Sequence, residues 1–358
     1  MTKNLFSACY MWGRHRILGM DNFKPTELSR SIGEISQVSM GLYHCSVVTK
    51  SGELFTFGSN KFNSLTHHST TIPTEVNLKN IKQAECGDNF TVALTNEGEV
   101  YTWGSAGGKH LWSHIVGKRH CLGIETKNDI KVPTKIKIPE EITQIACGRE
   151  HCLALGKFGV YCWGLNDFAQ LGEGSLYTNL QKPTLVTILN EKQERIVKLF
   201  AAQHSSAALT DRGKIYVWGG NSEGQLGINE DNLFQGWPRV LPLTEIYTVK
   251  DLYLGSNTIM VLTETNEIFV AGMNVWRKMT KFNLPNGLEP EQVCCGEDYF
   301  AVLCNGGQIT HYGGMFTNDP TPVELPDSLS VAPEMFIPGK VRRLEGKYGY
   351  LAAITVVE

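Results

Sequence analysis

The sequence has no long apolar run and no strong excess of either charge. Over 358 residues, no stretch approaches the roughly 18 apolar residues of a membrane-spanning helix, so no membrane span is expected. Lys and Arg total 33 against 36 Asp and Glu, which gives a net charge of −3. This balance excludes a nucleic-acid binder that works through bulk charge, and also an acidic disordered chain. Direct binding to nucleic acid is therefore not expected.

Cysteines spaced for redox or zinc chemistry are also missing. The ten cysteines include no Cys-x-x-Cys pair, and the first residues do not form the apolar core of a secretory signal. Disulfide frameworks are typical of short secreted chains, so these cysteines are expected to be reduced thiols. The sequence thus predicts a cytoplasmic protein, with the nucleus as a second location.

Catalytic motifs are absent as well. There is no His-Glu-x-x-His and no Gly-x-Ser-x-Gly. Residues 104–110 resemble a phosphate-binding loop, but three residues instead of four separate its outer glycines, and no Ser or Thr follows Lys109. His110, His114, His120 and Cys121 match no zinc-site spacing, and a solvated loop is expected there. The sequence predicts no catalytic residue, no cofactor and no metal.

What the chain does have is glycine, 36 in all, and the glycines mark an internal repeat. In residues 87–104, two β-prone runs are joined by Asn96-Glu97-Gly98, which indicates a hairpin. Similar blocks open at Gly41, Gly87, Gly148, Ala202, Gly255, Gly296 and Gly346. They close at a residue followed by Gly, and these closing residues are Trp12, Phe57, Trp103, Trp163, Trp218, Ala271 and Tyr312.

The repeat is split between the two ends of the chain. The block that opens at Gly346 stops at Glu358, and Trp12-Gly13 supplies its closing half. Pairing of the first and last strands in one blade would close a ring and leave no open sheet edge. Seven independent hairpins in a sandwich are the alternative, but that fold gives the split repeat no purpose.

Two positions of the repeat carry histidine or cysteine, residue types that often take part in catalysis or metal binding. His44 and His151 share a position with Phe90, Ser205, Thr258, Tyr299 and Gly349. Since these residues share no chemistry, packing or a hydrogen bond within the blade is expected there. Cys86, Cys147 and Cys295 directly precede an opening glycine, which indicates a small buried strand residue.

These blocks resemble the repeat of the regulator of chromosome condensation 1 (RCC1-like) family. The family pattern is Gly-x-x-His, Leu-Thr, a turn Gly, an aromatic-x-Trp-Gly, then Asn-x-x-Gly-Gln-Leu-Gly and a Pro, and residues 202–227 keep most of it. The resemblance covers residues 5–357 and implies an all-β, seven-bladed β-propeller forming a single domain over residues 1–358. Gln-Leu-Gly is whole only at 170–172 and 225–227, so this is a divergent member with no subfamily assigned.

The family pattern predicts that the repeat glycines have structural roles. They are Gly41, Gly58, Gly87, Gly104, Gly148, Gly164, Gly219, Gly255, Gly296, Gly313 and Gly346. Some members of the family sense ultraviolet light through stacked tryptophans. Here four tryptophans occupy the closing position of the repeat and the other three lie in connectors, so photoreception is not expected.

Partner binding is expected in the connectors between hairpins, because rigid strands leave recognition to loops. The long connector 105–132 offers Trp112, Lys118, Arg119 and His120, an aromatic beside cations as at binding hot spots. A tolerated surface insertion is the alternative. A second candidate is Trp276 with Arg277, where bulky and basic residues replace Gly-Gln-Leu-Gly. The alternative there is a tryptophan that packs between blades.

The resemblance implies a non-catalytic regulatory platform whose loops bind one or more proteins. A first alternative is guanine-nucleotide exchange on a small Ran-like GTPase, which needs no covalent chemistry and leaves the question of an enzyme open. A second is partnership with a small metalloprotein in tRNA or translation-factor modification. The partner, the face that binds it and the oligomeric state stay open.

Overall fold

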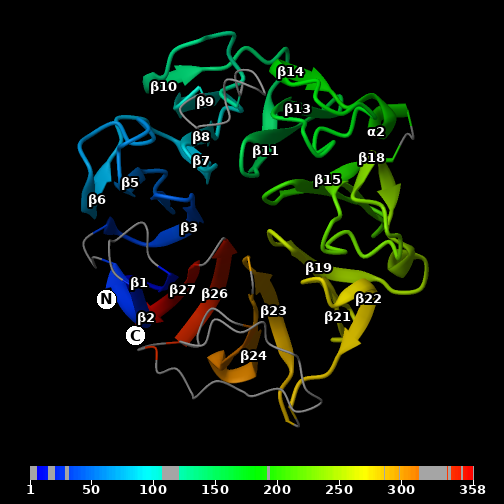
Figure 1. Cartoon of the computed structure of the whole chain (residues 1–358). Coiled ribbons are helices and arrows are strands. Elements are labelled where there is room, and N and C mark those ends of the chain that lie inside the picture. Colours follow the sequence, from blue (N-terminus) through cyan, green and yellow to red (C-terminus); the bar gives the residue numbers. More distant parts are fainter. Residues whose placement is uncertain are drawn as a thin grey trace.

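The computed structural model describes residues 6–14, 21–28, 32–106, 121–191, 194–285, 287–297, 299–313, 337, 340–347 and 350–357. Seven antiparallel sheets stand around a central channel (Figure 1). The predicted all-β, seven-bladed propeller is therefore confirmed. Within each blade the first strand lies nearest the channel, and the chain then moves outward strand by strand.

The first three blades follow one another in sequence. The first contains β3 (Ile35–Met40), β4 (His44–Thr49), β5 (Leu54–Gly58) and β6 (Thr70–Glu75). The second contains β7 (Ile81–Cys86), β8 (Phe90–Thr95), β9 (Val100–Gly104) and β10 (Ile130–Lys135). The third contains β11 (Ile142–Cys147), β12 (His151–Gly156), β13 (Val160–Gly164) and β14 (Leu180–Leu185).

The next three blades continue the pattern after the short helix α2 (Thr187–Glu191). The fourth contains β15 (Ile196–Ala201), β16 (Ser205–Thr210), β17 (Ile215–Gly220) and β18 (Phe234–Val240). After η2 (Pro242–Glu245), the fifth contains β19 (Val249–Leu254), β20 (Thr258–Thr263), β21 (Ile268–Gly272) and β22 (Trp276–Phe282). The sixth contains β23 (Pro290–Cys295), β24 (Tyr299–Cys304), η3 (Asn305–Gly307) and β25 (Ile309–Gly313), with three strands among its described residues.

The seventh blade joins the two ends of the chain. Its strand order is β2 (Asp21–Leu28), β1 (Phe6–Arg14), β27 (Tyr350–Val357) and β26 (Lys340–Lys347). β1 and β27 pair from Phe6 opposite Val357 to Gly13 opposite Tyr350. Both ends of the chain lie at this blade in Figure 1. The predicted closure of the ring by N-terminal and C-terminal strands is confirmed.

One register predicted from the sequence is wrong by one residue. Tyr350, not Gly349, lies opposite the closing Gly13, as His44 lies opposite Gly58. Lys347 faces Tyr350 across the hairpin and so holds the place of the opening glycine. Gly346 faces Leu351, as Met40 faces Cys45, and belongs to the position before it. Composition favours Gly346 as the opening residue because it is the nearest glycine before this hairpin. The register is fixed by strand pairing, which gives that place to Lys347.

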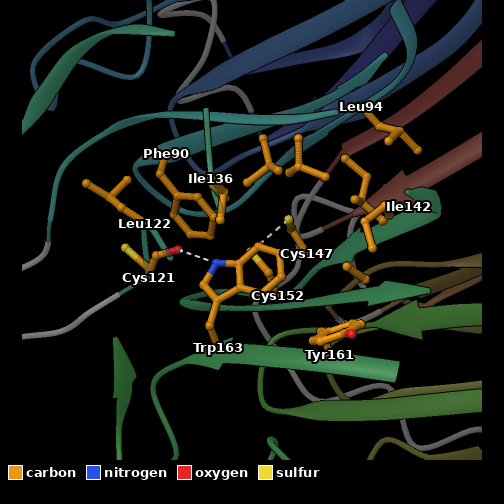
Figure 2. Close-up of a cluster of buried hydrophobic side chains, with 14 of the residues drawn as sticks. Phe90, Leu94, Cys121, Leu122, Ile136, Ile142, Cys147, Cys152, Tyr161 and Trp163 are labelled. Carbon is orange, nitrogen blue, oxygen red and sulfur yellow. Dashed lines mark hydrogen bonds between the residues drawn. The ribbon is translucent and has the colours of Figure 1, made fainter. Parts of the chain in front are cut away.

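The apolar core lies between neighbouring blades. Figure 2 shows the cluster between the second and third blades, where Phe90, Leu122 and Trp163 are buried together. The indole Nε1 of Trp163 donates to the carbonyl of Cys121 at 3.1 Å, so even this apolar cluster leaves no indole N–H unpaired.

Glutamines on the inner strands connect successive blades. The side chain of Gln83 donates to the carbonyl of Ile145 at 2.7 Å and accepts from the same residue's N–H at 2.9 Å. Gln144 makes the same two bonds with Leu199, at 3.0 and 2.8 Å. Gln292 makes them with Leu344, at 2.9 and 2.8 Å. Each amide thus satisfies the backbone of the next inner strand, and the ring stays closed around the channel.

Loss of one such amide is expected to destabilise the ring. Gln144→Ala leaves the N–H and C=O of Leu199 without these partners, at a cost of about 1–3 kcal/mol. Urea unfolding followed by fluorescence measures this change. Gln181→Ala, on the outer strand β14, is the matched control and should unfold like the wild-type chain. An unchanged midpoint for Gln144→Ala would contradict the bridging role.

Candidate functional site

Strand direction places the long connectors and the innermost turns on the same face. In each antiparallel blade, the turn after the first strand and the connector after the third leave at the same end. The turns are residues 41–43, 87–89, 148–150, 202–204 and 255–257. The connectors are residues 59–69, 165–179, 221–233 and 273–275, with 105–106 and 121–129 beside them. We call this end of the propeller the connector face.

The inner turns pack against one another around the axis. A β-carbon on Gly41 would lie 2.4 Å from the carbonyl oxygen of Gly87, and one on Gly148 would lie 2.1 Å from that of Ala202. Real β-carbons do not approach so closely, so glycine is needed where turns of adjacent blades touch. Asp88 and Arg149 add an ion pair between neighbouring turns at 2.8 Å.

The predicted repeat glycines fall into two groups in the structure. Gly41, Gly87, Gly148, Gly255 and Gly296 follow the inner strands. Gly58, Gly104, Gly164, Gly219 and Gly313 lie at the ends of the third strands with positive φ, where the connectors begin. At Gly104, a β-carbon would lie 2.5 Å from the carbonyl of Asn89, so this close approach also requires glycine.

Tryptophans at the closing position hold the connectors in place. The indole of Trp103 donates to the carbonyl of Ser64 at 2.9 Å, and that of Trp218 donates to Gln170 at 2.9 Å. In each case, the tryptophan of one blade binds the connector of the blade before it. The connectors are therefore fixed to the rigid ring at defined points.

His44 and His151 extend the same network. His44 Nε2 lies 3.0 Å from Thr91 Oγ1, which donates to the Ser64 carbonyl. His151 Nε2 lies 2.9 Å from Ser206 Oγ, which donates to the Gln170 carbonyl. Burial, aided by the charge of Lys347, lowers the pKa of His44 to about 3. Burial likewise lowers the pKa of His151 to about 3. Both rings thus stay neutral near pH 7 and act as hydrogen-bonding groups between blades.

The residues predicted to bind partners are only partly described. Trp276 begins β22, is half-buried and packs against the cluster around Met260 and Phe300, as the packing alternative expected. Arg277 reaches the connector of the fourth blade, where its Nε lies 3.3 Å from Asp231 Oδ1. Trp112, Lys118, Arg119 and His120 lie outside the described residues. Ala106 and Cys121, at the two ends of that segment, lie on the connector face.

The central channel contains a cavity of about 200 Å³. Lys347 stands at its connector end, and its ammonium donates to the carbonyls of Cys86 and Cys147 at 2.6 and 2.8 Å. It thereby crosses from the seventh blade to the second and third. Sequence reasoning missed this residue because the opening position was assigned to Gly346.

In the described part of the chain, the cysteines are buried and the potential metal ligands are dispersed. All ten cysteines are free and buried, and burial raises the pKa of the Cys86 thiol to about 12, which makes it a poor nucleophile. Among the described residues, no three His, Cys, Asp or Glu side chains gather as metal ligands would. No helix in the described part is long and apolar enough to span a membrane.

Comparison with known proteins identifies the repeat. A model of the regulator of chromosome condensation (RCC1) repeat matches residues 51–94, 97–155 and 159–209. A second model of this repeat matches residues 81–108, 142–170 and 197–225.

Curated relatives share part of their length with this chain. The ultraviolet-B receptor UVR8 of Arabidopsis thaliana is 29% identical over 275 residues, which is 73% of this chain and 59% of the receptor. The X-linked retinitis pigmentosa GTPase regulator of Mus musculus is 35% identical over 190 residues, 52% of this chain and 17% of that protein. The chain thus spans less than two thirds of the length of these relatives.

Solved structures share the whole fold at lower identity. Human WBSCR16 superposes with a TM-score of 0.80 at 18% identity, covering 99% of both chains. Yeast RCC1 (Prp20), solved with Kap60 bound, gives 0.80 at 17% identity and covers 99% of this chain and 90% of that one. At such identities the likeness establishes the fold.

The two buried histidines should make stability depend on pH. Their folded pKa of about 3 lies below the usual 6.5, so the unfolded chain binds more protons and stability falls as the pH drops below about 6.5. Each histidine contributes up to about 1.4 kcal/mol per pH unit. Replacing both with phenylalanine, which Phe90 shows to fit this position, should flatten the slope between pH 6.5 and about 4. Urea titrations at several pH values measure it, with His68→Phe, an exposed imidazole, as control. An unchanged slope would contradict their neutral state.

Lys347 is expected to stabilise the ring through the channel. Lys347→Met removes the charged donor of two buried carbonyls, and we expect a loss of about 1.5–3 kcal/mol in unfolding free energy. Lys340→Met, at the exposed start of the same strand, is the control. Equal stability of the two variants would show that the ammonium does not contribute there.

Proposed function

We propose that this chain, which belongs to the family of RCC1-repeat β-propellers, is a non-catalytic regulatory platform that binds partner proteins through its connector face. The observation that carries the proposal is the attachment of the connectors to a rigid ring. Ser64, Cys121 and Gln170 each accept an indole N–H from the following blade. A surface that is already ordered loses little conformational entropy when a partner binds.

The chemistry of the described residues supports binding over catalysis. Polar groups at and beneath the connector face bond to each other, as in the Asp88–Arg149 pair and the buried His44–Thr91 contact. Side chains that bond to one another in this way hold the surface in one conformation. Arg277, half-buried and paired with Asp231 of the fourth blade's connector, agrees with such a contact surface.

A second candidate function is guanine-nucleotide exchange on a small GTPase. Two relatives favour it: the yeast Prp20 structure was described with its binding to Gsp1p and histones, and a mouse relative is called a GTPase regulator. Exchange needs a face that displaces nucleotide, and requires no covalent chemistry by the propeller. For this chain we therefore propose a protein partner, with a GTPase as the specific case to test.

The thiols support a proposal for the compartment. Ten free, buried cysteines suit a reducing environment. We propose the cytoplasm, with the nucleus as a second location, and microscopy of the tagged chain tests this.

Affinity capture in the absence and presence of GTP separates the two functions. An exchange factor holds the nucleotide-free GTPase most tightly, so a GTPase partner should be retained without nucleotide and released by excess GTP. A platform should retain its partner in both buffers. The tagged full chain is incubated with cytosol, and bound proteins are identified by mass spectrometry. Gly148→Val, which forces the packed inner turns apart, is the control variant and should lose the partner. Failure to retain any protein would contradict the proposal.

A further inference from the structure

Five large apolar side chains are exposed on the connector face where the third and fourth blades meet. Their exposed fractions are 39% for Phe168, 72% for Tyr177, 67% for Leu233, 39% for Phe234 and 49% for Trp237. Exposed apolar groups are ordinary when scattered, but gathered aromatics are typical of binding surfaces. We call these five residues the aromatic patch.

The connector of the third blade is joined directly to β18, the outer strand of the fourth blade. The N–H of Gly174 donates to the carbonyl of Gly236 at 3.0 Å. A β-carbon on Gly174 would lie 2.1 Å from the ring of Trp237, so this tryptophan packs flat over the glycine. Tyr177 lies three residues after Gly174 in the same connector. Trp237 and Tyr177 are therefore held on neighbouring parts of one surface.

Phe168 and Phe234 meet at a second glycine. Phe234 is the strand partner of Gly220, and a β-carbon on Gly220 would lie 3.7 Å from Cβ of Phe168. The ring of Phe168 also rests on His204, with centroids 4.2 Å apart. Gly220 itself adds no side chain between the two phenylalanines, and His204 lies beside them. The patch therefore spans the boundary between the third and fourth blades.

The backbone at Tyr177 is held in an unusual conformation. Its φ is +63°, a left-handed value that bulky residues rarely adopt. Its N–H donates to the carbonyl of Asn166 at 3.1 Å, which holds the loop there. A conformation of this kind costs free energy, and such residues cluster at functional sites. Asparagine would fit this backbone better than tyrosine, so an exposed aromatic ring is a costly choice here.

The two connectors beside the patch are acidic in sequence and contain no lysine or arginine. The two connectors contribute the carboxylates of Asp167, Glu173, Glu223, Glu230 and Asp231. Two guanidinium groups form ion pairs with these carboxylates: Arg239 pairs with Glu230, and Arg277 pairs with Asp231. Carboxylates thus outnumber cations within these two connectors. A partner that complements this surface carries apolar side chains beside basic ones.

From this geometry we infer that the aromatic patch is the docking surface for a segment of a partner protein that presents aliphatic or aromatic side chains flanked by lysine or arginine. The inference rests on the proposed platform function and gives it a place and a partner chemistry. A second copy of the chain fits less well, because a twofold contact would bring the same carboxylates together.

The test uses peptides of about twelve residues, displayed on phage as a random library and selected on the full chain. The patch variant carries Tyr177→Asn, which suits the left-handed backbone, with Leu233→Ser. The control variant carries Phe158→Asn with Ile72→Ser, side chains that are 70% and 66% exposed on other parts of the propeller. Both variants remove an exposed aromatic and an exposed aliphatic group, so neither should affect folding.

Peptides enriched on the wild-type chain should combine apolar residues with lysine or arginine. Their affinity should fall by about tenfold or more on the patch variant and stay unchanged on the control variant. Enrichment of acidic peptides, absence of enrichment, or equal binding to the patch variant would overturn the inference. So would a dimer, detected by light scattering, that dissociates only in the patch variant.

The captured partner separates this inference from the platform function itself. If that partner binds the patch variant as tightly as the wild type, the platform stands and the aromatic patch is not its docking surface. If the patch variant loses the partner and the control variant keeps it, both proposals are supported.

Discussion

At three junctions between blades, the inner strand is joined to its neighbour by a glutamine side chain that bonds to backbone as another strand would. Gln83, Gln144 and Gln292 each satisfy one N–H and one carbonyl of the following blade. The apolar clusters between blades supply most of the burial, but they do not fix register. The amides do, because both of their bonds fit only one alignment. The turns and connectors of the blades joined in this way depend on that alignment.

A second set of contacts holds the connectors in fixed positions on the ring. An indole from one blade binds the connector carbonyl of the blade before it, and a buried histidine and hydroxyl support the same carbonyl at Ser64 and Gln170. Long loops are usually the most mobile parts of a fold. Here their bases are tied to the core, which leaves their outer side chains as a prearranged surface. The aromatic patch lies on that surface, where the connector of the third blade meets the outer strand of the fourth.

Much of the fold could be predicted because it repeats. The closing glycines and aromatic residues recur, and a repeat divided between the termini has a physical purpose only in a ring. The assignment of Gly346 failed because composition suggested a glycine where hairpin pairing places Lys347. The bridging residues Gln83 and Gln144, and Gln37, which accepts from the N–H of Ala84, all occur as Ile-x-Gln in the sequence, but only the structure shows that they bond across blades. The aromatic patch could not be predicted from the sequence, because it depends on a contact between Gly174 and Gly236, which are far apart in the sequence.

Hydrogen exchange of the chain, alone and with its captured partner, tests the central claim that one face of a rigid ring is the interaction surface. The account predicts added protection in residues 165–179, 221–233 and 273–275, with the inner strands slow to exchange in both states. Protection confined to the opposite face, at residues 50–53, 96–99 and 136–141, would contradict it. So would inner strands that exchange rapidly in the free chain, since the ring would then not be the rigid support that the connectors require.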